Sequence, residues 1–269
     1  MQLKTNLHFH TADDPQDFVL YSTEEGIDYA ASLGFDALAI TCHQRAAWAP
    51  AYAAYAAGRG ILLIPGIEIN IRTTDTRAIT SARGRHPAAR GGHRHARRGR
   101  HLIILNCTPE AERVRTFSDL RAYRAAHPEC LVLAPHPFSY GNFSLKRFLE
   151  RHIDLIDAVE HTWFYSRRFD RNKKAAAIAT KYHLPLIVTS DAHTFRNMDT
   201  DYALIDAKEK TIPALFEAIK KNKIANITRS KKIIREMAIP AAALVSRNFL
   251  YRRGWKPKNP ARATILPRR

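Results

Sequence analysis

Two short stretches of the sequence carry metal-ligand side chains at alternate positions. His8 and His10 lie in NLHFHT, and Asp191 and His193 lie in TSDAH. Alternate residues of an extended chain point to the same side, so each pair could bind one ion. Imidazole suits Zn, Fe, Ni or Mn, and a carboxylate can bridge two ions. A single HxH pair is more often structural than a ligand, so the other ligand-type residues decide whether a metal site is expected.

Four further residues of this kind stand at the ends of short apolar runs: His43 in ITCH, Glu68 in PGIEI, His101 at the start of HLIIL and His136 in APHP. If these runs are strands of a parallel barrel, their carboxyl ends meet at one face, where barrel enzymes place their active sites. His101 begins its run, so it reaches that face only if the third and fourth strands form an antiparallel hairpin. Eight ligand-type side chains would then converge, enough for two or three metal ions.

Apolar runs and amphipathic stretches alternate along the chain, which favours a largely parallel sheet with crossover helices. Strands are expected at 3–8, 37–41, 61–69, 102–106, 131–134, 155–159 and 186–189. Helices are expected at 23–33, 47–59, 119–126, 171–182 and 213–221. Seven strands predict a closed or nearly closed α/β barrel, with an open doubly wound sheet as the alternative.

Composition sets outer limits on the class of protein. The chain has 269 residues, of which 45% are hydrophobic and 25% charged, and this balance excludes a disordered or collagen-like chain. Cys42, Cys107 and Cys130 are too few and too scattered for a disulfide framework, which indicates a reducing compartment and a cytoplasmic location. No run of about 18 apolar residues occurs, so no membrane span is expected. The first ten residues lack the apolar stretch of a secretory signal.

The net charge of +18 comes from two segments. Residues 72–100 contribute +8 and residues 229–269 contribute +11, so the rest of the chain is nearly neutral. The first segment is rich in Arg, Gly, His and Ala, and we expect a disordered basic insertion there, unless it is a misread stretch of the gene. We therefore expect a barrel domain over 1–228 and a basic tail over 229–269. Nucleic acid could bind through the two basic segments.

Taken in order, the motifs NLHFHT, ITCH, PGIEI, HLIIL, APHP and TSDAH resemble those of the PHP (polymerase and histidinol phosphatase) family of metal-dependent phosphoesterases. The resemblance covers about residues 1–228, apart from 72–100. It implies a distorted (β/α)7 barrel of the PHP type with a cleft for two or three divalent metals, usually Zn, Mn or Fe. It also implies hydrolysis of phosphate esters.

The resemblance further implies a set of ligands. His8, His10, Glu68 and Asp191 would hold a first metal, and Glu68 would bridge to a second metal held by His101 and His136. His43 and His193 would hold a third, with Asp14, or Asp13 as the alternative. Catalytic roles would fall to Glu68, Asp191 and His193. The family often has Asp where this chain has Cys42, which predicts a slightly weaker third site because a hydrogen bond to the ligand is lost.

Phosphate groups that no metal binds need Arg or Lys, and Arg45 and Arg196 follow two of the ligand histidines closely enough to bind substrate. A solvated loop position is an equally good interpretation for each. Glu160 and His161 end the sixth strand, where either could orient a ligand or contact substrate. Neither GxSxG nor GxxxxGK[ST] occurs, so serine-hydrolase and P-loop chemistry have no support. The expected function is hydrolysis of a small phosphomonoester. The alternative is a phosphodiesterase, an exonuclease or a binding module that acts on nucleic acid.

Overall fold

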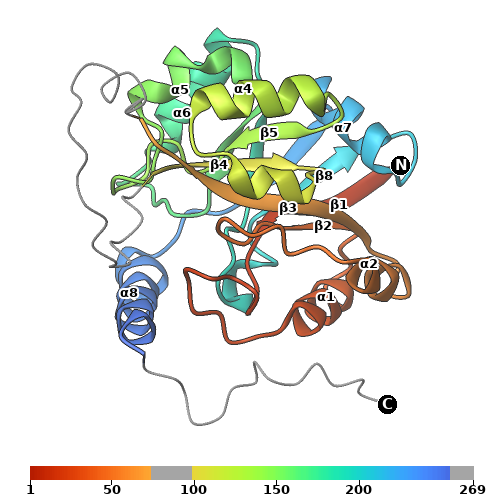
Figure 1. The fold of residues 1–269 in the computed structure, drawn as a ribbon. Coiled ribbons are helices and arrows are strands. Elements are labelled where there is room, and N and C mark those ends of the chain that lie inside the picture. Colours follow the sequence, from red (N-terminus) through yellow and green to blue (C-terminus); the bar gives the residue numbers. More distant parts are fainter. Residues whose placement is uncertain (74–98, 255–269) are drawn as a thin grey trace, which may run out of the picture.

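The computed structural model describes residues 1–73 and 99–254, in which one nine-stranded sheet curves into a nearly closed barrel (Figure 1). The strands lie side by side in the order β7-β6-β5-β4-β3-β2-β1-β8-β9. Their bounds are β1 (Gln2–Phe9), β2 (Ala37–Ile40), β3 (Leu62–Ile71), β4 (Arg100–Leu105), β5 (Leu131–Ala134), β6 (Ala158–Thr162), β7 (Leu186–Thr189), β8 (Tyr202–Asp206) and β9 (Ile224–Ile227). Each of the seven expected strands has a counterpart, although β6 begins three residues later than expected because Ile153–Leu155 form a 3₁₀ turn. The expected α/β barrel is confirmed. Most of the expected basic insertion lies outside the described residues.

The direction of β4 decides where His101 lies. β4 pairs antiparallel with β3, with Asn70 opposite His101 and Glu68 opposite Ile103. It also pairs antiparallel with β5, whereas β1–β2, β2–β3, β5–β6 and β6–β7 are parallel pairs. Because β4 is reversed, its first residues lie beside the last residues of β3. The antiparallel pairing that His101 requires is present, and it brings His101 to the end of the barrel at which β1, β2 and β3 finish.

Two strands that the apolar pattern did not reveal, β8 and β9, complete the sheet. β8 runs antiparallel to β1, and β9 runs antiparallel to β8. The gap between β9 and β7 is bridged by the side chain of Asn226. Its Oδ1 accepts the Val188 N–H at 2.8 Å, and its Nδ2 donates to the Leu186 carbonyl at 2.8 Å. One amide side chain therefore takes the place of a backbone ladder at the closing seam of the barrel.

Helices cover the outside of the sheet (Figure 1). At the start of α1, the Ser22 hydroxyl accepts the Glu25 N–H and the Glu25 carboxylate accepts the Ser22 N–H, a capping box that fixes the predicted start of the helix. Thr116 and Asp119 form the same arrangement before α4. The helices are α1 (Thr23–Ser32), α2 (Pro50–Ala57), α4 (Phe117–Ala126), α5 (Arg147–Arg151), α6 (Asn172–Lys181), α7 (Ile212–Lys220) and α8 (Ile239–Arg252). Shorter turns are the 3₁₀ segments η1 (Pro109–Arg113), η2 (Ile153–Leu155) and η3 (Phe195–Asn197) and the π-helix η4 (Ile233–Ala238).

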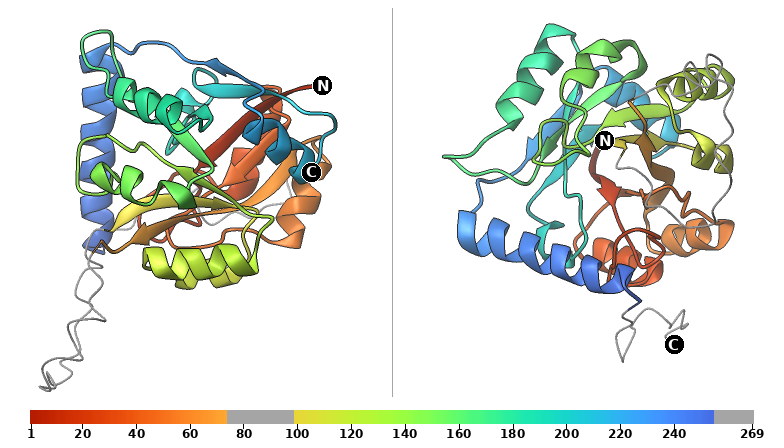
Figure 2. Two further views of the ribbon diagram at one scale, coloured as in Figure 1. Left: turned by 90° about the horizontal axis from the view of Figure 1, so that it is seen from above. Right: turned by 60° about the vertical axis from the view of Figure 1, so that its left-hand side comes forward.

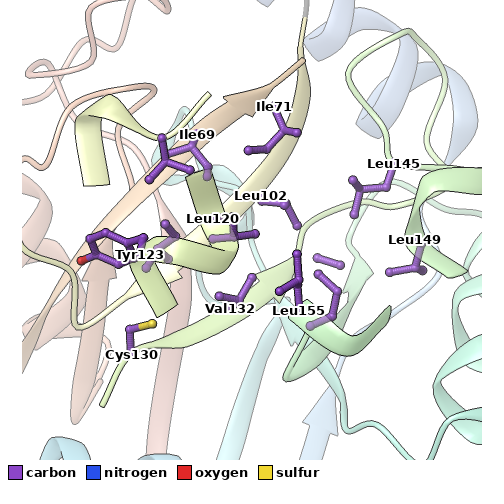
Figure 3. Packing of buried hydrophobic residues seen from close by; sticks show 14 of the residues in the cluster. Ile69, Ile71, Leu102, Leu120, Tyr123, Cys130, Val132, Leu145, Leu149 and Leu155 are labelled. Atoms are coloured by element: carbon purple, nitrogen blue, oxygen red, sulfur yellow. The ribbon is translucent and has the colours of Figure 1, made fainter. Parts of the chain in front are cut away.

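The alternation of side chains along β4 separates two apolar clusters. Ile103 and Leu105 belong to the cluster inside the barrel, and side chains of α7 are part of the same cluster. Leu102 and Ile104 point the other way, into the layer between the sheet and helices α4 and α5, part of which Figure 3 shows. Glu68 lies opposite Ile103 in the register, and directly opposed residues share a face of the sheet. The carboxylate of Glu68 therefore points into the barrel.

The segment after β9 packs back onto the barrel. Lys231 is buried and its Nζ lies 2.6 and 2.8 Å from the two carboxylate oxygens of Asp201. Further on, the Asn248 Oδ1 of α8 accepts the Phe18 N–H at 2.8 Å. These contacts place α8 beside the loop that follows β1, on the side of the barrel away from the N-terminus (Figures 1 and 2). None of the helices within 1–73 and 99–254 is long and apolar enough to cross a membrane.

Candidate metal centre

Glu68 lies at the centre of the predicted ligand cluster, and its two oxygens face different histidines. Its Oε1 lies 2.6 Å from His101 Nδ1 and 3.3 Å from His136 Nε2. Its Oε2 lies 3.1 Å from His43 Nε2 and 3.5 Å from the Nε2 atoms of both His8 and His10. The Glu68 side chain is 1% exposed, so the protein shields the carboxylate almost completely from solvent. This arrangement is the one that a carboxylate bridging two cations requires.

The remaining predicted ligands complete overlapping groups. Asp191 Oδ1 lies 3.3 Å from His8 Nε2 and 3.5 Å from both His10 Nε2 and His193 Nδ1. Four sets of three residues have ligand atoms within 4.8 Å of one another: His8, His10 and Asp191; His8, Glu68 and His136; His43, Glu68 and His101; and His10, His43 and His193. The structure therefore brings all eight residues of the predicted cluster into one place. Which ion each residue binds stays a prediction.

Backbone hydrogen bonds between loops hold these positions together. The His10 N–H donates to the Ala192 carbonyl at 3.1 Å, which joins the HxH motif to the SDAH motif. The Glu68 N–H donates to the Cys42 carbonyl at 3.2 Å, and the Gln44 N–H returns to the Glu68 carbonyl at 2.7 Å. Gly66 allows β3 to approach the end of β2 closely enough for the hydrogen bonds of Glu68, because a Cβ at position 66 would lie only 2.9 Å from the Ile40 carbonyl oxygen.

Two ligand positions have unusual backbone conformations. His136 has φ of 29° and Asp191 has φ of 45°, in the left-handed region that side-chain-bearing residues seldom occupy. Such conformations cost of order 1–3 kcal/mol each and persist where the surroundings impose them, often at functional sites. In these conformations the His136 side chain faces Glu68, and the Asp191 side chain faces His8 and His10.

Asp14 lies behind the imidazoles of two ligands. Its Oδ2 is 2.8 Å from His10 Nδ1 and 2.8 Å from His43 Nδ1, and it also accepts the His43 N–H at 2.8 Å. Its Oδ1 accepts the N–H groups of Gln16 and Asp17. With both oxygens occupied in this way, Asp14 fits a role in orienting His10 and His43 so that their Nε2 atoms face the cluster. The alternative, Asp13, instead bonds the hydroxyls of Thr23 and Tyr52.

Two more carboxylates contact the ligands. Glu160 is fully buried, its Oε1 lies 3.0 Å from His8 Nδ1, and it also accepts hydrogen bonds from the Thr189 hydroxyl and the His136 N–H. Asp17 Oδ2 lies 3.0 Å from His193 Nε2. The position of Glu160 at the end of the sixth strand predicted that it could orient a ligand, whereas the contact of Asp17 with His193 was not predicted. The signal for Asp17 was its place in the acidic stretch after the HxH pair.

The electrostatic environment favours positive charge. Burial on its own lowers the pKa of His43, but Glu68 and Asp14 outweigh it and raise the pKa to about 10. For the carboxyl of Asp17, burial on its own raises the pKa, but the hydrogen bond with His193 outweighs burial and lowers the pKa to about 2. The pKa of Glu68 is also held well below its usual range, against burial, by His101, His43 and His8. The carboxylates are therefore ionised at neutral pH, in surroundings that stabilise cations.

The donor set fits divalent metal ions. His101 Nδ1, His136 Nδ1 and Glu68 Oε1 are buried and have no hydrogen-bond partner among the described residues. His101 Nδ1 and Glu68 Oε1 lie 2.6 Å apart, so two atoms that could bind one metal ion stand side by side. Buried polar atoms left without partners are costly, and a cation held between His101 Nδ1 and Glu68 Oε1 would satisfy both of these atoms. Nitrogen and oxygen ligands without a thiolate are those that Zn, Mn and Fe accept. Cys42, Cys107 and Cys130 are free and buried.

The predicted substrate-binding arginines lie at the periphery. Arg45 is mostly exposed, and its Nη1 donates to the Asp13 carbonyl at 3.3 Å. Arg196 lies exposed in η3. Another cation, which sequence analysis did not single out, is Arg247 of α8: its guanidinium lies 5.5 Å from the Phe18 ring and interacts with Asp17, and its Nε is buried with no hydrogen-bond partner among the described residues.

Comparisons with known proteins agree with the motifs. Residues 169–224 match the family model "PHP-associated". No curated protein sequence matches the chain. Among solved structures, a two-domain protein from Bacteroides vulgatus that contains a predicted PHP-like metal-dependent phosphoesterase superposes with a TM-score of 0.59 at 17% identity, over 85% of this chain and 65% of that one. The present chain therefore spans less than two thirds of that protein.

Two further structures have the same fold. The lesion-specific endonuclease Q of Pyrococcus furiosus superposes with a TM-score of 0.54 at 14% identity, over 84% of this chain and 58% of that one. An amidohydrolase from Chromobacterium violaceum, solved with bound sulfate and no metal, gives a TM-score of 0.52 at 16% identity, over 82% of this chain and 97% of that one. At these identities the likeness concerns the fold. The shared fold and the matched PHP-associated segment agree with the resemblance of the motifs to the PHP family.

Proposed function

We propose that the protein hydrolyses phosphate esters with the help of two or three divalent metal ions. The observation that carries the proposal is the position of Glu68, whose two oxygens face two separate sets of imidazoles inside the barrel. The Bacteroides vulgatus protein of the same fold contains a predicted PHP-like metal-dependent phosphoesterase, and we extend that class of reaction to this chain. Divalent ions bound here would lower the pKa of a water molecule to about 7 and neutralise charge on the phosphoryl oxygens.

The residues of the cluster differ in solvent exposure, and this difference limits the role that each can have. His8, His10 and Glu68 are at most 1% exposed, so they can bind ions but cannot contact a large substrate. The side chains of Asp191, His101 and His193 are 21%, 14% and 11% exposed and mark where the cluster opens to solvent. Substrate and attacking water must approach from that side. Asp191 and His193 are therefore placed to orient the water and to pass a proton to the leaving oxygen.

Positive charge near this opening would hold the phosphate group. Arg247 interacts with Asp17, which in turn contacts His193, so a guanidinium lies close to the exposed edge of the cluster. Arg45 and Arg196 remain candidates for the same role from the loops after His43 and His193. Guanidinium groups suit phosphate because their donors match its oxygens in pairs.

A small phosphomonoester is the substrate class that we favour. Most ligand side chains are buried, and the ring of Phe143 lies 5.2 Å from that of His101 and 5.1 Å from that of His136. A terminal phosphate group on a slender molecule would reach such a recessed cluster more readily than the backbone of a duplex.

Action on nucleic acid is the second candidate. It is favoured by the concentration of basic residues in 72–100 and 229–269 and by the shared fold with a lesion-specific endonuclease. Binding of this kind loses affinity steeply as salt rises. If nucleic-acid binding were the main activity, salt-sensitive binding to DNA or RNA would survive Asp191→Ala and would not depend on metal.

The test is a phosphate-release screen of mono- and diesters with metal-stripped protein reloaded separately with Zn, Mn or Fe. We expect activity with at least one ester, loss of activity on chelation, and a loss of at least about a thousandfold in His10→Ala and Asp191→Ala. Circular dichroism and elemental analysis of each variant separate loss of chemistry from loss of fold or of metal. Turnover that persists in either variant, or after metal removal confirmed by elemental analysis, would exclude the proposed mechanism.

A further inference from the structure

Helix α8 has its apolar residues on the outside. Large hydrophobic side chains along it are exposed to an unusual degree: Ile239 59%, Val245 68%, Phe249 51% and Leu250 46%. At 100° per residue these four positions fall on one side of the helix, together with the exposed residues Ala242, Ala243 and Ser246. Among these seven residues on the solvent-facing side of α8, Ser246 is the only polar one. We call this surface, Ile239 to Leu250, the outer face of α8.

The inner face of α8 is more polar than the outer face. Asn248 is buried and accepts the Phe18 N–H, and the neighbouring Arg247 lies against the Phe18 ring. The rings of Tyr251 and Phe18 are 5.3 Å apart. Because these contacts fix the rotation of the helix, the outer face cannot turn inward to bury its apolar residues. An exposed apolar surface of this kind marks an interaction site.

Basic residues flank the outer face at both ends. At the amino-terminal end, Lys232 directly precedes the π-helix η4. This helix carries Arg235, and its residue Ile234 is 73% exposed. At the other end the guanidinium of Arg253 lies 4.1 Å from the centre of the Phe249 ring. From Met237 to the last residue the sequence contains eight Lys and Arg residues and no Asp or Glu.

The combination of an apolar face with basic flanks points to one kind of partner. A second copy of the chain docked through α8 would bring two strongly basic segments together, and like charges oppose such a contact. Anionic lipid headgroups have the opposite charge, and the acyl region beneath them takes up aliphatic and aromatic side chains. We infer that α8 lies in the interface of an anionic membrane, with its outer face in the acyl boundary and Lys232, Arg235 and Arg253 among the headgroups. This inference does not depend on the proposed function.

The experiment is co-sedimentation of the full-length protein with phosphatidylcholine vesicles and with mixed phosphatidylcholine–phosphatidylglycerol vesicles. We expect binding to the mixed vesicles, much weaker binding to the neutral ones, and weakening as salt is raised. In the double variant Val245→Ser/Phe249→Ser, binding to mixed vesicles should fall by about tenfold or more, because two exposed apolar side chains are lost. Both replaced side chains are mostly solvent-exposed, so the fold should persist, and circular dichroism checks this.

The matched control is Trp48→Ser, which removes a 40%-exposed aromatic residue from another part of the surface and should leave vesicle binding unchanged. Failure of the wild-type protein to bind mixed vesicles would overturn the inference. So would equal binding by Val245→Ser/Phe249→Ser, since the basic segments alone would then explain the association. Sedimentation of the wild type as a dimer that the double variant dissociates would assign the outer face to a second copy instead.

Discussion

Two carboxylates contact imidazoles of the cluster through the Nδ1 atom; for one of them, Asp14, the expected role as a ligand of the third metal stays a prediction. Glu160 contacts His8 through Nδ1, and Asp14 contacts His10 and His43 through the same ring atom. A histidine whose Nδ1 is held in this way presents Nε2 to an ion in a fixed direction and with increased basicity. The carboxylate of Glu160 is itself held in place, because it also accepts hydrogen bonds from the Thr189 hydroxyl and the His136 N–H.

Glu160→Gln tests this orienting role. Loss of the negative charge should lower metal affinity by about 10- to 100-fold, because His8 loses its anionic partner while the shape of the side chain is kept. Titration of stripped protein with Zn or Mn, followed by elemental analysis, measures the affinity directly. Glu150→Gln is the matched control, since that carboxylate is exposed and pairs only with Lys181 and Tyr182 at the surface. Unchanged metal affinity in Glu160→Gln would show that His8 needs no such partner.

The three cysteines should be chemically silent in the folded protein. Burial raises the pKa of Cys107 to about 12 and of Cys130 to about 11, and it raises that of Cys42 further. Only the thiolate reacts quickly, so at pH 8 a disulfide reagent should modify the native protein at least about a hundredfold more slowly than the unfolded chain. In denaturant three thiols should react. Fast modification of any thiol before unfolding would contradict the buried positions of these residues.

At this scale the sequence predicted which residues cluster inside the barrel, but it did not predict all of the residues that contact them. His8, His10 and Asp191 could be recognised because alternate positions in an extended chain share a direction. Asp17 and Arg247 could not, because Asp17 reaches His193 through a loop of irregular shape and Arg247 approaches from more than two hundred residues away. Contacts of that kind depend on tertiary packing, which local patterns do not encode.

At the scale of elements, the parallel strands were predictable and the closing strands were not. β5 and β7 are short, continuous apolar runs, as buried parallel strands usually are. β9 lies at the sheet edge, and three of its four residues are exposed, so its sequence IANI gave no strong signal. The same exposure explains why closure between β7 and β9 depends on the Asn226 side chain rather than on a ladder of apolar pairs.

Asn226→Ala should therefore weaken the closing seam. The substitution leaves the Val188 N–H and the Leu186 carbonyl without their partner, at a cost of about 1–2 kcal/mol in the free energy of unfolding. Urea denaturation followed by circular dichroism gives this value. Hydrogen exchange at the Val188 amide should accelerate in the same variant. Lys223→Ala, at an exposed position just before β9, is the control, and equal stability of the two variants would mean that the amide bridge contributes nothing.

For the whole molecule, the sequence did not reveal how the C-terminal segment attaches to the barrel. We expected a separate basic tail from residue 229, and the described part of it is helical and bound to the barrel. The attachment uses one basic residue in an unexpected way, because Lys231 is 4% exposed and pairs with the fully buried Asp201. Sequence alone gives no reason to single out this lysine from its basic neighbours.

Lys231→Met should destabilise the protein by about 3 kcal/mol, because it leaves the carboxylate of Asp201 buried without its cation. The hydroxyls of Thr200 and Thr228, 2.7 and 2.6 Å from Asp201, compensate only part of the lost interaction. The double variant Lys231→Met/Asp201→Asn should recover much of the loss, since no unpaired charge remains. The matched control is Lys221→Met, which breaks the exposed pair with Glu217 and should cost less than about 1 kcal/mol. Urea denaturation measures all four proteins, and a similar loss in Lys231→Met and Lys221→Met would mean that the buried pair does not hold the C-terminal segment to the barrel.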